Sequence, residues 1–276
     1  YLNIAAIMSA AVATRAEAVH PGYGFLSEKS SFAEICGSCG VTFIGPSVRN
    51  MRVMGDKARA RRAADRAGVP TIPGDSRGFL KAEEAIEVAD RAGFPILLKA
   101  CAGGGGRGMK IVNNREEFAA QFATGQREVE AAFGDGHLLV EKYLPRVRHI
   151  EVQIAGDRLQ NVIHLGIRDC SIQRRYQKLI EESPSIGLAP ELQERIQNAA
   201  VELGRSAKYT NVGTVEFLAD LERQEFYFIE MNTRLQVEHP VTEMATDTDI
   251  VKEQIRLAAG LELSFEQKNI RITGHT

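Results

Sequence analysis

The sequence VGTVEFLA at residues 212–219 and the sequence EFYFIEMN at residues 225–232 are two apolar runs separated by a short charged turn. Runs rich in Val, Ile and Phe that flank a polar turn predict paired antiparallel strands. A hairpin centred on Arg223 would place Glu216 directly opposite Glu230, with their Cβ atoms about 5 Å apart. The pairing predicts an antiparallel sheet with two acidic side chains on one face.

Each of these predicted strands carries one carboxylate among apolar residues, Glu216 on the first and Glu230 on the second. Two carboxylates in a half-buried sheet repel each other, so a bound cation or a proton must neutralise part of their charge. Oxygen ligands that are few and leave room for phosphate oxygens suit Mg²⁺. The alternative is that one side chain faces solvent, because a slip of one residue in register turns it to the other face.

Polar residues recur with period two along the second strand and beyond it, at Glu230, Asn232, Arg234, Gln236 and Glu238. An extended segment would place all five side chains on one side. A solvated strand face has the same alternation. The identity of the groups favours a binding site, because a guanidinium and an amide can hold a flat oxyanion such as bicarbonate and a further carboxylate can act as a base.

A glycine-rich run, GGGGRG at residues 103–108, lies between predicted strands at 94–100 and 109–112. The run contains GxGxxG, but a dinucleotide motif requires a helix after the glycines, and a strand is predicted there. Consecutive glycine amides can form a concave anion site, and Lys99 can reach the same anion. The alternative is a flexible hairpin tip. The sequence has no Walker A motif, so the predicted phosphate site is of another kind.

The rest of the sequence mixes helical and extended segments, which predicts the α+β class. Residues 1–49 are expected to be the end of an α/β layer that closes with a short strand at 41–46. The basic stretch 169–178 is by itself expected to be a solvated loop, but next to a triphosphate its Lys178 would neutralise phosphate charge. Further helices are predicted at residues 51–67, 82–92, 115–133, 191–208 and 250–259, and further strands at 137–142, 149–155 and 161–167.

The 276 residues are 44% apolar and carry a formal net charge of −2, which is enough apolar surface for a substantial core. So small a net charge argues against the strong positive field with which proteins bind nucleic acid or anionic membranes. No apolar run approaches the roughly 20 residues of a membrane span. We therefore expect small molecules and proteins as partners, and neither nucleic acid nor membrane.

Cys36 and Cys39 form a CxxC pair, but no second pair or suitably spaced histidine accompanies it, so ordinary reduced thiols in a cytoplasmic protein are expected. Residues 2–13 are apolar but lack a preceding basic region, which favours a packed helix over a signal peptide. The sequence starts at Tyr1 and stops at Thr276, and we expect it to be part of a larger protein.

Four further motifs accompany the glycine run: HPGYGFLSE at residues 20–28, MGDK at 54–57, RDCSIQRR at 168–175 and FIEMNTRLQVEHP at 228–240. Together they closely resemble the biotin carboxylases of the ATP-grasp superfamily, from end to end of the chain. The last motif is highly specific, whereas the glycine run alone is not. The resemblance implies an ATP-grasp domain with antiparallel sheets at residues 50–259. The end of a Rossmann-like α/β N-terminal domain at 1–49 would precede it, and the start of a truncated C-terminal domain at 260–276 would follow.

The resemblance also implies roles for individual residues. Glu216 and Glu230 would bind Mg²⁺ with help from Asn232, and Glu238 would be the base that deprotonates bicarbonate. Lys178, Arg234 and the backbone of Val237 would form the bicarbonate pocket. The nucleotide would be bound by Lys57, Lys99, Gly105, Gly106, Glu141, Lys142, Tyr143, Leu144, His149, Gln173 and Tyr176. Many family members have His where this chain has Tyr176, and Ala102 replaces a common glycine of the hairpin, which the resemblance implies to be a lid.

The implied activity is that of a ligase that uses MgATP, or MnATP, and bicarbonate to carboxylate biotin on a carrier protein. Bicarbonate would attack the γ-phosphoryl group to give carboxyphosphate, which supplies CO₂ to biotin. Implied partners are a biotin carboxyl carrier protein, a carboxyltransferase and a second copy of the full-length parent in a homodimer. The family's arginine that steadies the biotin enolate would lie beyond Thr276, so this chain alone can bind nucleotide and yet fail to carboxylate biotin.

Several alternatives remain open at this point. General similarity favours the free subunit of an acetyl-CoA carboxylase in fatty acid biosynthesis over a domain of a pyruvate or propionyl-CoA carboxylase. Another bicarbonate ligase, such as half of a carbamoyl-phosphate synthetase, is disfavoured by the motifs at 20–28 and 234–240. A non-catalytic ATP-binding module is disfavoured because binding alone does not require a bicarbonate pocket.

Overall fold

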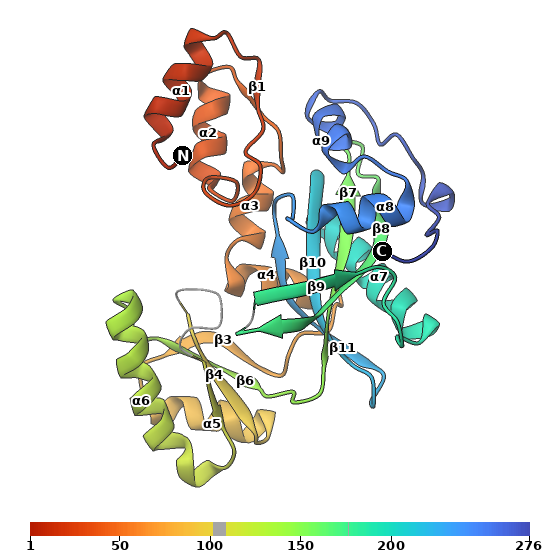
Figure 1. Cartoon of the computed structure of the whole chain (residues 1–276). Helices are drawn as coiled ribbons and strands as arrows, with labels where there is room; N and C mark the ends of the chain where they lie inside the picture. The colour runs from red at the N-terminus through yellow and green to blue at the C-terminus, as the bar shows by residue number, and fades with distance from the viewer. Residues whose placement is uncertain (102–108, 176) are drawn as a thin grey trace. The chain divides into compact units, whose positions relative to one another are not determined.

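A computed structural model describes residues 1–101, 109–175 and 177–276 (Figure 1). The glycine run, including Gly105 and Gly106, and Tyr176 lie outside the described residues, and so does the predicted lid. The contacts divide the chain into two compact units, and each is described by itself. Unit 1 comprises residues 1–70, 148–171 and 180–276, and unit 2 comprises residues 71–147 and 172–179.

Unit 1 begins with an α/β segment. Its elements are α1 (Ile4–Ala13), β1 (Ala18–Val19), α2 (Ser30–Ser38) and β2 (Thr42–Phe43). The two strands pair in parallel, which requires a crossover, and α2 lies on that connection. Met8, Phe32 and Cys36 are buried together, and all four cysteines are free thiols. The predicted α/β character of this segment and a helix within residues 2–13 are thus confirmed.

Two helices occupy the region where one was predicted at residues 51–67. They are α3 (Val48–Met54) and α4 (Lys57–Arg66). Gly55 and Asp56 separate them, and the Asp56 carboxylate accepts a hydrogen bond from the backbone N–H of Arg59 at 2.8 Å. Asp at an N-cap satisfies an otherwise unpaired helix amide, so it starts a new helix here. The prediction of a single helix was therefore wrong.

The larger sheet has five strands in the order β11-β10-β7-β8-β9. They are β7 (Arg148–Gly156), β8 (Val162–Arg174), β9 (Gln177–Glu182), β10 (Asn211–Asp220) and β11 (Glu225–Asn232). β10 runs antiparallel to β7 and β11, and β7 runs antiparallel to β8. Most of the stretch 169–178 lies on β8 and β9, so the expected basic loop was wrong. β8 continues past the predicted end at residue 167, where Asp169 pairs with Ile150 of β7, and both Asp169 and Cys170 are buried.

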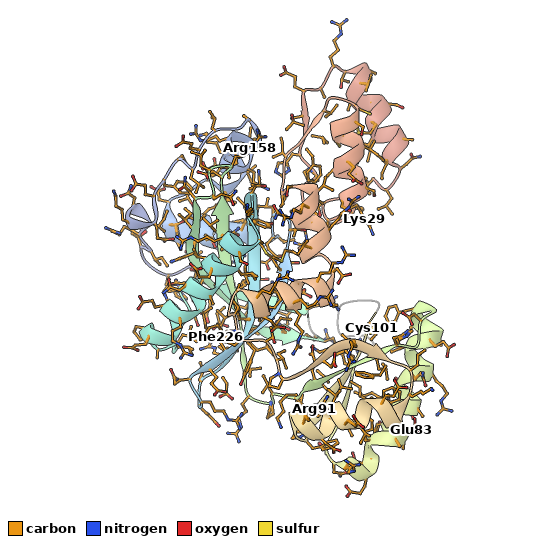
Figure 2. The ribbon with its side chains drawn as sticks, turned by 180° about the vertical axis from the view of Figure 1, so that it is seen from behind. Lys29, Glu83, Arg91, Cys101, Arg158 and Phe226 are labelled. Atoms are coloured by element: carbon orange, nitrogen blue, oxygen red, sulfur yellow. The ribbon has the colours of Figure 1, made fainter. Side chains whose placement is uncertain are left out.

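The core of the larger sheet is aromatic and aliphatic. Leu192 and Ile196 of α7 (Pro190–Ser206) belong to the same buried cluster as the strand residues Phe217 and Phe226. The two phenylalanine rings meet edge to face with their centroids 5.6 Å apart, and Phe226 is labelled in Figure 2. Outside the ladder, the backbone N–H of Phe228 on β11 donates to the carbonyl of Pro70 at 2.7 Å.

Two helices and a short 3₁₀ helix follow β11: α8 (His239–Thr246), α9 (Ile250–Ala258) and η1 (Gln267–Asn269). α8 was not predicted, although Pro240 in its first turn is a known helix-start signal. α9 matches the predicted helix at 250–259. Among the described residues, no helix has both the length and the apolar character needed to cross a membrane.

Unit 2 contains a four-stranded antiparallel sheet in the order β3-β6-β4-β5. Its strands are β3 (Gly74–Phe79), β4 (Ile96–Ala100), β5 (Lys110–Val112) and β6 (Leu138–Lys142), and its helices are α5 (Ala82–Ala92) and α6 (Arg115–Phe133). Phe118 and Phe122 of α6 are buried with Leu98 and Val140 of the sheet. β4 and β5 pair as predicted, so a strand rather than a helix follows the glycine run. β3 was not predicted.

Candidate functional site

Glu216 on β10 lies directly opposite Glu230 on β11. Nearer the turn, Phe217 pairs with Phe228, so Ile229 is an extra residue that forms a β-bulge. Without this bulge the ladder would place Ile229 opposite Glu216. The predicted pairing of the two carboxylates is confirmed, and it depends on an irregularity that the sequence did not predict.

The Glu216 carboxylate is held by side chains from three parts of the fold. Its Oε2 lies 2.9 Å from Nε2 of His149 on β7. Its Oε1 accepts hydrogen bonds from Asn232 at 2.8 Å and from Gln236 at 3.2 Å. His149, Glu151 and Glu216 offer ligand atoms that lie within 4.8 Å of one another. Glu216 therefore has a fixed position in a cluster that is able to bind a cation.

Glu230 has a different environment. No side chain of the described ranges donates a hydrogen bond to its half-buried carboxylate. Burial raises the pKa of Glu230 and the charge of Glu216 raises it further, whereas Lys57 opposes the shift. A carboxylate in this position favours a proton or a cation. With the oxygens of Glu216 and Asn232 nearby, the residues fit a small cation with oxygen ligands, such as Mg²⁺.

β11 ends at Asn232, and residues 233–238 form an irregular loop. The prediction of one extended polar face is therefore wrong beyond Asn232. Thr233 and Leu235 are as deeply buried as their polar neighbours, because Leu235 packs in a cluster with Ile250 of α9. Polar and apolar residues of this loop are both buried, so their exposure does not alternate as it would on a strand with one face in solvent.

The loop nevertheless gathers polar groups around the Arg234 guanidinium. Its Nη atoms donate to Asn232 at 3.1 Å and to Gln236 at 2.9 Å, and its Nε lies 3.2 Å from a carboxylate oxygen of Glu28. Val237 is 59% exposed. Glu28 lies in the HPGYGFLSE motif, but the sequence analysis assigned it no role. Its pairing with Arg234 links that motif to the predicted bicarbonate residues.

Glu238 is the N-cap residue of α8, and only 8% of it is exposed. Its carboxylate, the carboxylate of Glu151 and the thiol of Cys170 lie within 4.8 Å of one another. Arg168, which is fully buried, interacts electrostatically with Glu238. Neither Glu151 nor Arg168 was expected to belong to the site. A signal for Glu151 is present, because it alternates with apolar residues along β7.

In unit 2, Lys99 on β4 and Glu141 on β6 form an ion pair with 2.5 Å between Nζ and Oε2. Lys99 was expected to contact phosphate and Glu141 to contact adenine, and the structure brings the two side chains together. The Lys142 ammonium donates to the Gly93 carbonyl at 2.8 Å, and Leu144 is buried.

The other predicted ligands lie on several elements. Tyr143 follows β6, and its backbone N–H donates to the carbonyl of Pro95 at 3.1 Å. Gln173 is on β8, Lys178 is on β9, and Lys57 is the first residue of α4.

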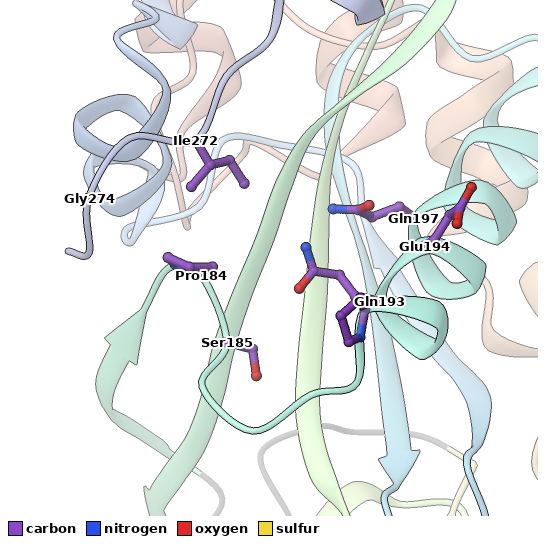
Figure 3. A pocket seen from close by; sticks show the side chains of 8 residues that line it. Pro184, Ser185, Gln193, Glu194, Gln197, Ile272 and Gly274 are labelled. Atoms are coloured by element: carbon purple, nitrogen blue, oxygen red, sulfur yellow. The ribbon is translucent and has the colours of Figure 1, made fainter.

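A separate hollow of about 420 Å³ lies by the loop before α7 (Figure 3). Pro184 and Ser185 of that loop line it, together with Gln193 and Glu194 of α7 and Ile272 of the C-terminal segment. None of the predicted site residues lines this hollow, and we do not assign it to the site.

Two α+β units with antiparallel sheets, one of which carries the facing carboxylates, define the ATP-grasp class. Residues 56–266 match the family model of the carbamoyl-phosphate synthase L chain, ATP binding domain, and residues 1–51 match that of the biotin carboxylase N-terminal domain. The chain belongs to the biotin carboxylase family.

Several relatives are similar over the whole chain. A biotin carboxylase of Nostoc sp. is 52% identical over 276 residues, which are 100% of this chain and 61% of that protein. The crystal structure of a Campylobacter jejuni biotin carboxylase–β,γ-ATP complex has a TM-score of 0.93 and 49% identity, and covers 100% of this chain and 61% of its own.

A second solved structure is the biotin carboxylase domain dimer of the Hydrogenobacter thermophilus 2-oxoglutarate carboxylase, in complex with MgADP, ADP and bicarbonate. It has a TM-score of 0.92 and 52% identity, and covers 100% of this chain and 60% of its own. The chain thus spans about three fifths of the length of these relatives.

Proposed function

We propose that this chain is the nucleotide-binding part of a biotin carboxylase, a ligase that uses MgATP and bicarbonate to carboxylate biotin on a carrier protein. The observation that carries the proposal is the β10–β11 hairpin. It sets Glu216 against Glu230 and leads directly into the loop with Arg234 and Glu238. A cation site and an oxyanion site on one continuous segment suit phosphoryl transfer to bicarbonate.

We assign the cation to Glu216 and Glu230, with Asn232 assisting. Mg²⁺ is the expected ion and Mn²⁺ is compatible with the same ligands. When bound, the ion neutralises charge on the phosphate oxygens. The side chains of His149, Asn232 and Gln236 keep Glu216 in place in the meantime.

For the nucleotide, we propose phosphate contacts from Lys57, Lys99 and the backbone of Gly105 and Gly106. Residues 141–144, which are Glu141, Lys142, Tyr143 and Leu144, are assigned to adenine, with His149, Gln173 and Tyr176 as further contacts. These residues span the end of β6 at Lys142, and the backbone N–H of Tyr143 is bonded to the Pro95 carbonyl, so the adenine assignment uses the other backbone groups of this stretch. These roles rest on position in the family motifs.

For bicarbonate, we propose binding by Lys178, Arg234 and the backbone of Val237, with Glu238 as the base. Glu238 takes the proton of the bicarbonate hydroxyl. The freed oxygen forms a bond to the γ-phosphorus, while the bond from that phosphorus to the β–γ bridging oxygen breaks. The products are ADP and carboxyphosphate, and carboxyphosphate then supplies CO₂ to biotin. Lys178 and Arg234 act by fixing the anion in line with the phosphoryl group.

We further propose that the complete protein is a cytoplasmic homodimer that works with a biotin carboxyl carrier protein and a carboxyltransferase. In the domain division that we propose, residues 1–49 end the N-terminal domain, 50–259 form the ATP-grasp domain and 260–276 begin the C-terminal domain. The parent is proposed to be an acetyl-CoA carboxylase, with a pyruvate or propionyl-CoA carboxylase as the alternative. One of the similar proteins described above is a 2-oxoglutarate carboxylase, so the acceptor of the carboxyl group is identified by a separate assay of candidate acceptors.

The test uses the complete protein that contains this chain. ADP release from MgATP is measured with and without bicarbonate and free biotin. Bicarbonate-dependent release that biotin stimulates supports the proposal. ATP binding without such turnover would favour a non-catalytic ATP-binding module, and stimulation by ammonia in place of biotin would favour a carbamoyl-phosphate-forming ligase.

A further inference from the structure

Arg168 on β8 is the largest fully buried side chain in the described part of the chain. Its Nε donates to the carboxylate of Glu151, which is also fully buried. One Nη donates to Gln153 at 3.0 Å and to Thr242 at 2.8 Å, and the other donates to Thr214 at 3.2 Å. Four of the five N–H groups of the guanidinium therefore have protein acceptors.

These partners come from different elements of unit 1. Glu151 and Gln153 lie on β7, whereas Thr242 lies on α8, directly after Glu238. Residues four apart on a helix lie on one face, so Thr242 sits one turn below the N-cap residue Glu238. The bond from Arg168 to Thr242 thus ties the sheet to the helix that begins at the proposed base.

Arg168 also faces the charge of this base. The carboxylates of Glu238 and Glu151 lie within 4.8 Å of each other and both residues are buried, so they repel. Burial lowers the pKa of Arg168, but the charges of Glu151 and Glu238 outweigh this effect and hold its pKa above the ordinary value. A permanently charged guanidinium therefore offsets the repulsion between the two carboxylates.

Stability alone does not account for this arrangement. Replacing a buried ion pair with apolar residues of similar size is often neutral or stabilising, because the pair loses its hydration on folding. The hydrogen bonds of the Arg168 guanidinium have fixed directions and join three elements, β7, β10 and α8, which an apolar side chain would not do. They fix the position of α8, the helix that begins at Glu238.

We infer that Arg168 is a positioning residue for Glu238. It binds Glu151 of the sheet and Thr242 of α8 at the same time, and it thereby fixes the helix that begins at Glu238. The inference rests on the proposed role of Glu238 as the base. It assigns to Arg168 a function in the bicarbonate step that does not require contact with bicarbonate.

The test compares Thr242→Val with Thr246→Val in the complete protein. Both threonines are buried on α8, but only the Thr242 hydroxyl accepts a hydrogen bond from Arg168, whereas the Thr246 hydroxyl donates to the backbone carbonyl of Thr242 at 2.7 Å. Thr242→Val is expected to lower kcat for bicarbonate-dependent ADP release by about tenfold or more, with KM for ATP within about twofold of wild type. Thr246→Val is expected to leave both within about twofold. Arg168→Lys keeps the charge without the fork and is expected to lower kcat in the same way.

A second measurement does not depend on turnover. Amide hydrogen exchange at residues 237–242 without substrates is expected to be faster in Thr242→Val and Arg168→Lys than in Thr246→Val. Equal kcat and equal exchange in the two threonine variants would overturn the inference, and so would a loss of ATP affinity as large as the loss of turnover. Absence of bicarbonate-dependent turnover in the wild type would instead contradict the proposed function, and the exchange data would still decide whether Arg168 positions α8.

Discussion

Nε2 of His149 lies 2.9 Å from Oε2 of Glu216, across the β7–β10 pair. Glu216 also receives hydrogen bonds from Asn232 and Gln236, whereas within the described ranges Glu230 receives none. The two carboxylates of the proposed cation site therefore differ in how firmly other side chains hold them. Glu216 is held in place by the protein, and Glu230 is available to adjust to an ion.

Glu230→Gln is expected to weaken Mg²⁺-dependent ATP binding by about tenfold or more, because an amide cannot supply the second negative charge. Calorimetric titration with ATP at several Mg²⁺ concentrations measures this change. Glu225→Gln is the matched control, since Glu225 is an exposed carboxylate at the start of the same strand. Unchanged Mg²⁺ dependence in Glu230→Gln would exclude the pair as the metal site.

The raised pKa of Glu230 predicts a specific pH dependence without metal. Burial and the charge of Glu216 raise this pKa above 4.5, so the folded protein binds the proton more tightly than the unfolded chain does. That stabilisation is present at acid pH and is lost as the pH rises through the raised pKa. Glu230→Gln, which cannot ionise, should therefore gain stability relative to wild type as the pH rises above 4.5. Urea unfolding at a series of pH values measures the free energy of unfolding of both proteins. A difference between variant and wild type that stays constant with pH would refute the raised pKa of Glu230.

Arg234→Ala and Glu238→Gln, made in the complete protein, should affect chemistry more than nucleotide binding. Loss of a positioned base typically lowers a rate by about 10²–10⁴, and we expect at least the lower value for bicarbonate-dependent ATP cleavage. The affinity for ATP should change little. Met244→Ala, an exposed change on α8, is the control. Near-normal turnover in both site variants would remove this loop from the mechanism.

His164 on β8 should make the fold sensitive to acid. Burial lowers its pKa from 6.5 to about 4, so the unfolded chain binds a proton that the folded protein does not. Stability should therefore fall as the pH decreases from about 6.5 to about 4. His164→Gln should reduce that fall by about 1–2 kcal/mol, since partial exposure diminishes the full linkage energy. The free energy of unfolding is measured by urea unfolding at several pH values. If it falls equally with decreasing pH in the variant and in the wild type, the lowered pKa of His164 is contradicted.

Local patterns predicted most of the elements near the site. The apolar runs around Glu216 and Glu230 were sufficient to place the hairpin and the pairing across it. Arg234 and Glu238 were expected to continue the strand, because alternation in sequence does not distinguish a strand from a loop that is buried on both sides. The bulge at Ile229 has no sequence signature of its own, since it depends on how the turn and the ladder fit together.

Other features depend on contacts between residues far apart in the chain. Arg168 and Thr242 are 74 residues apart, and no local pattern indicates that they meet. The ion pair of Lys99 and Glu141 likewise depends on the pairing of β4 with β6. The first contact depends on how α8 packs on the larger sheet and the second on the order of strands in the smaller one, and neither is visible in a local sequence pattern.

The hydrogen bond from Phe228 to Pro70 has a consequence for association between molecules. β11 is an edge strand, and the free N–H groups of an edge are a template for adding a strand from another chain. Pro70 occupies one of these N–H groups with its carbonyl, and as a proline it has no N–H with which to extend the ladder outward. The segment that follows α4 therefore closes the edge of the hairpin, at Phe228, to pairing with a strand from another molecule.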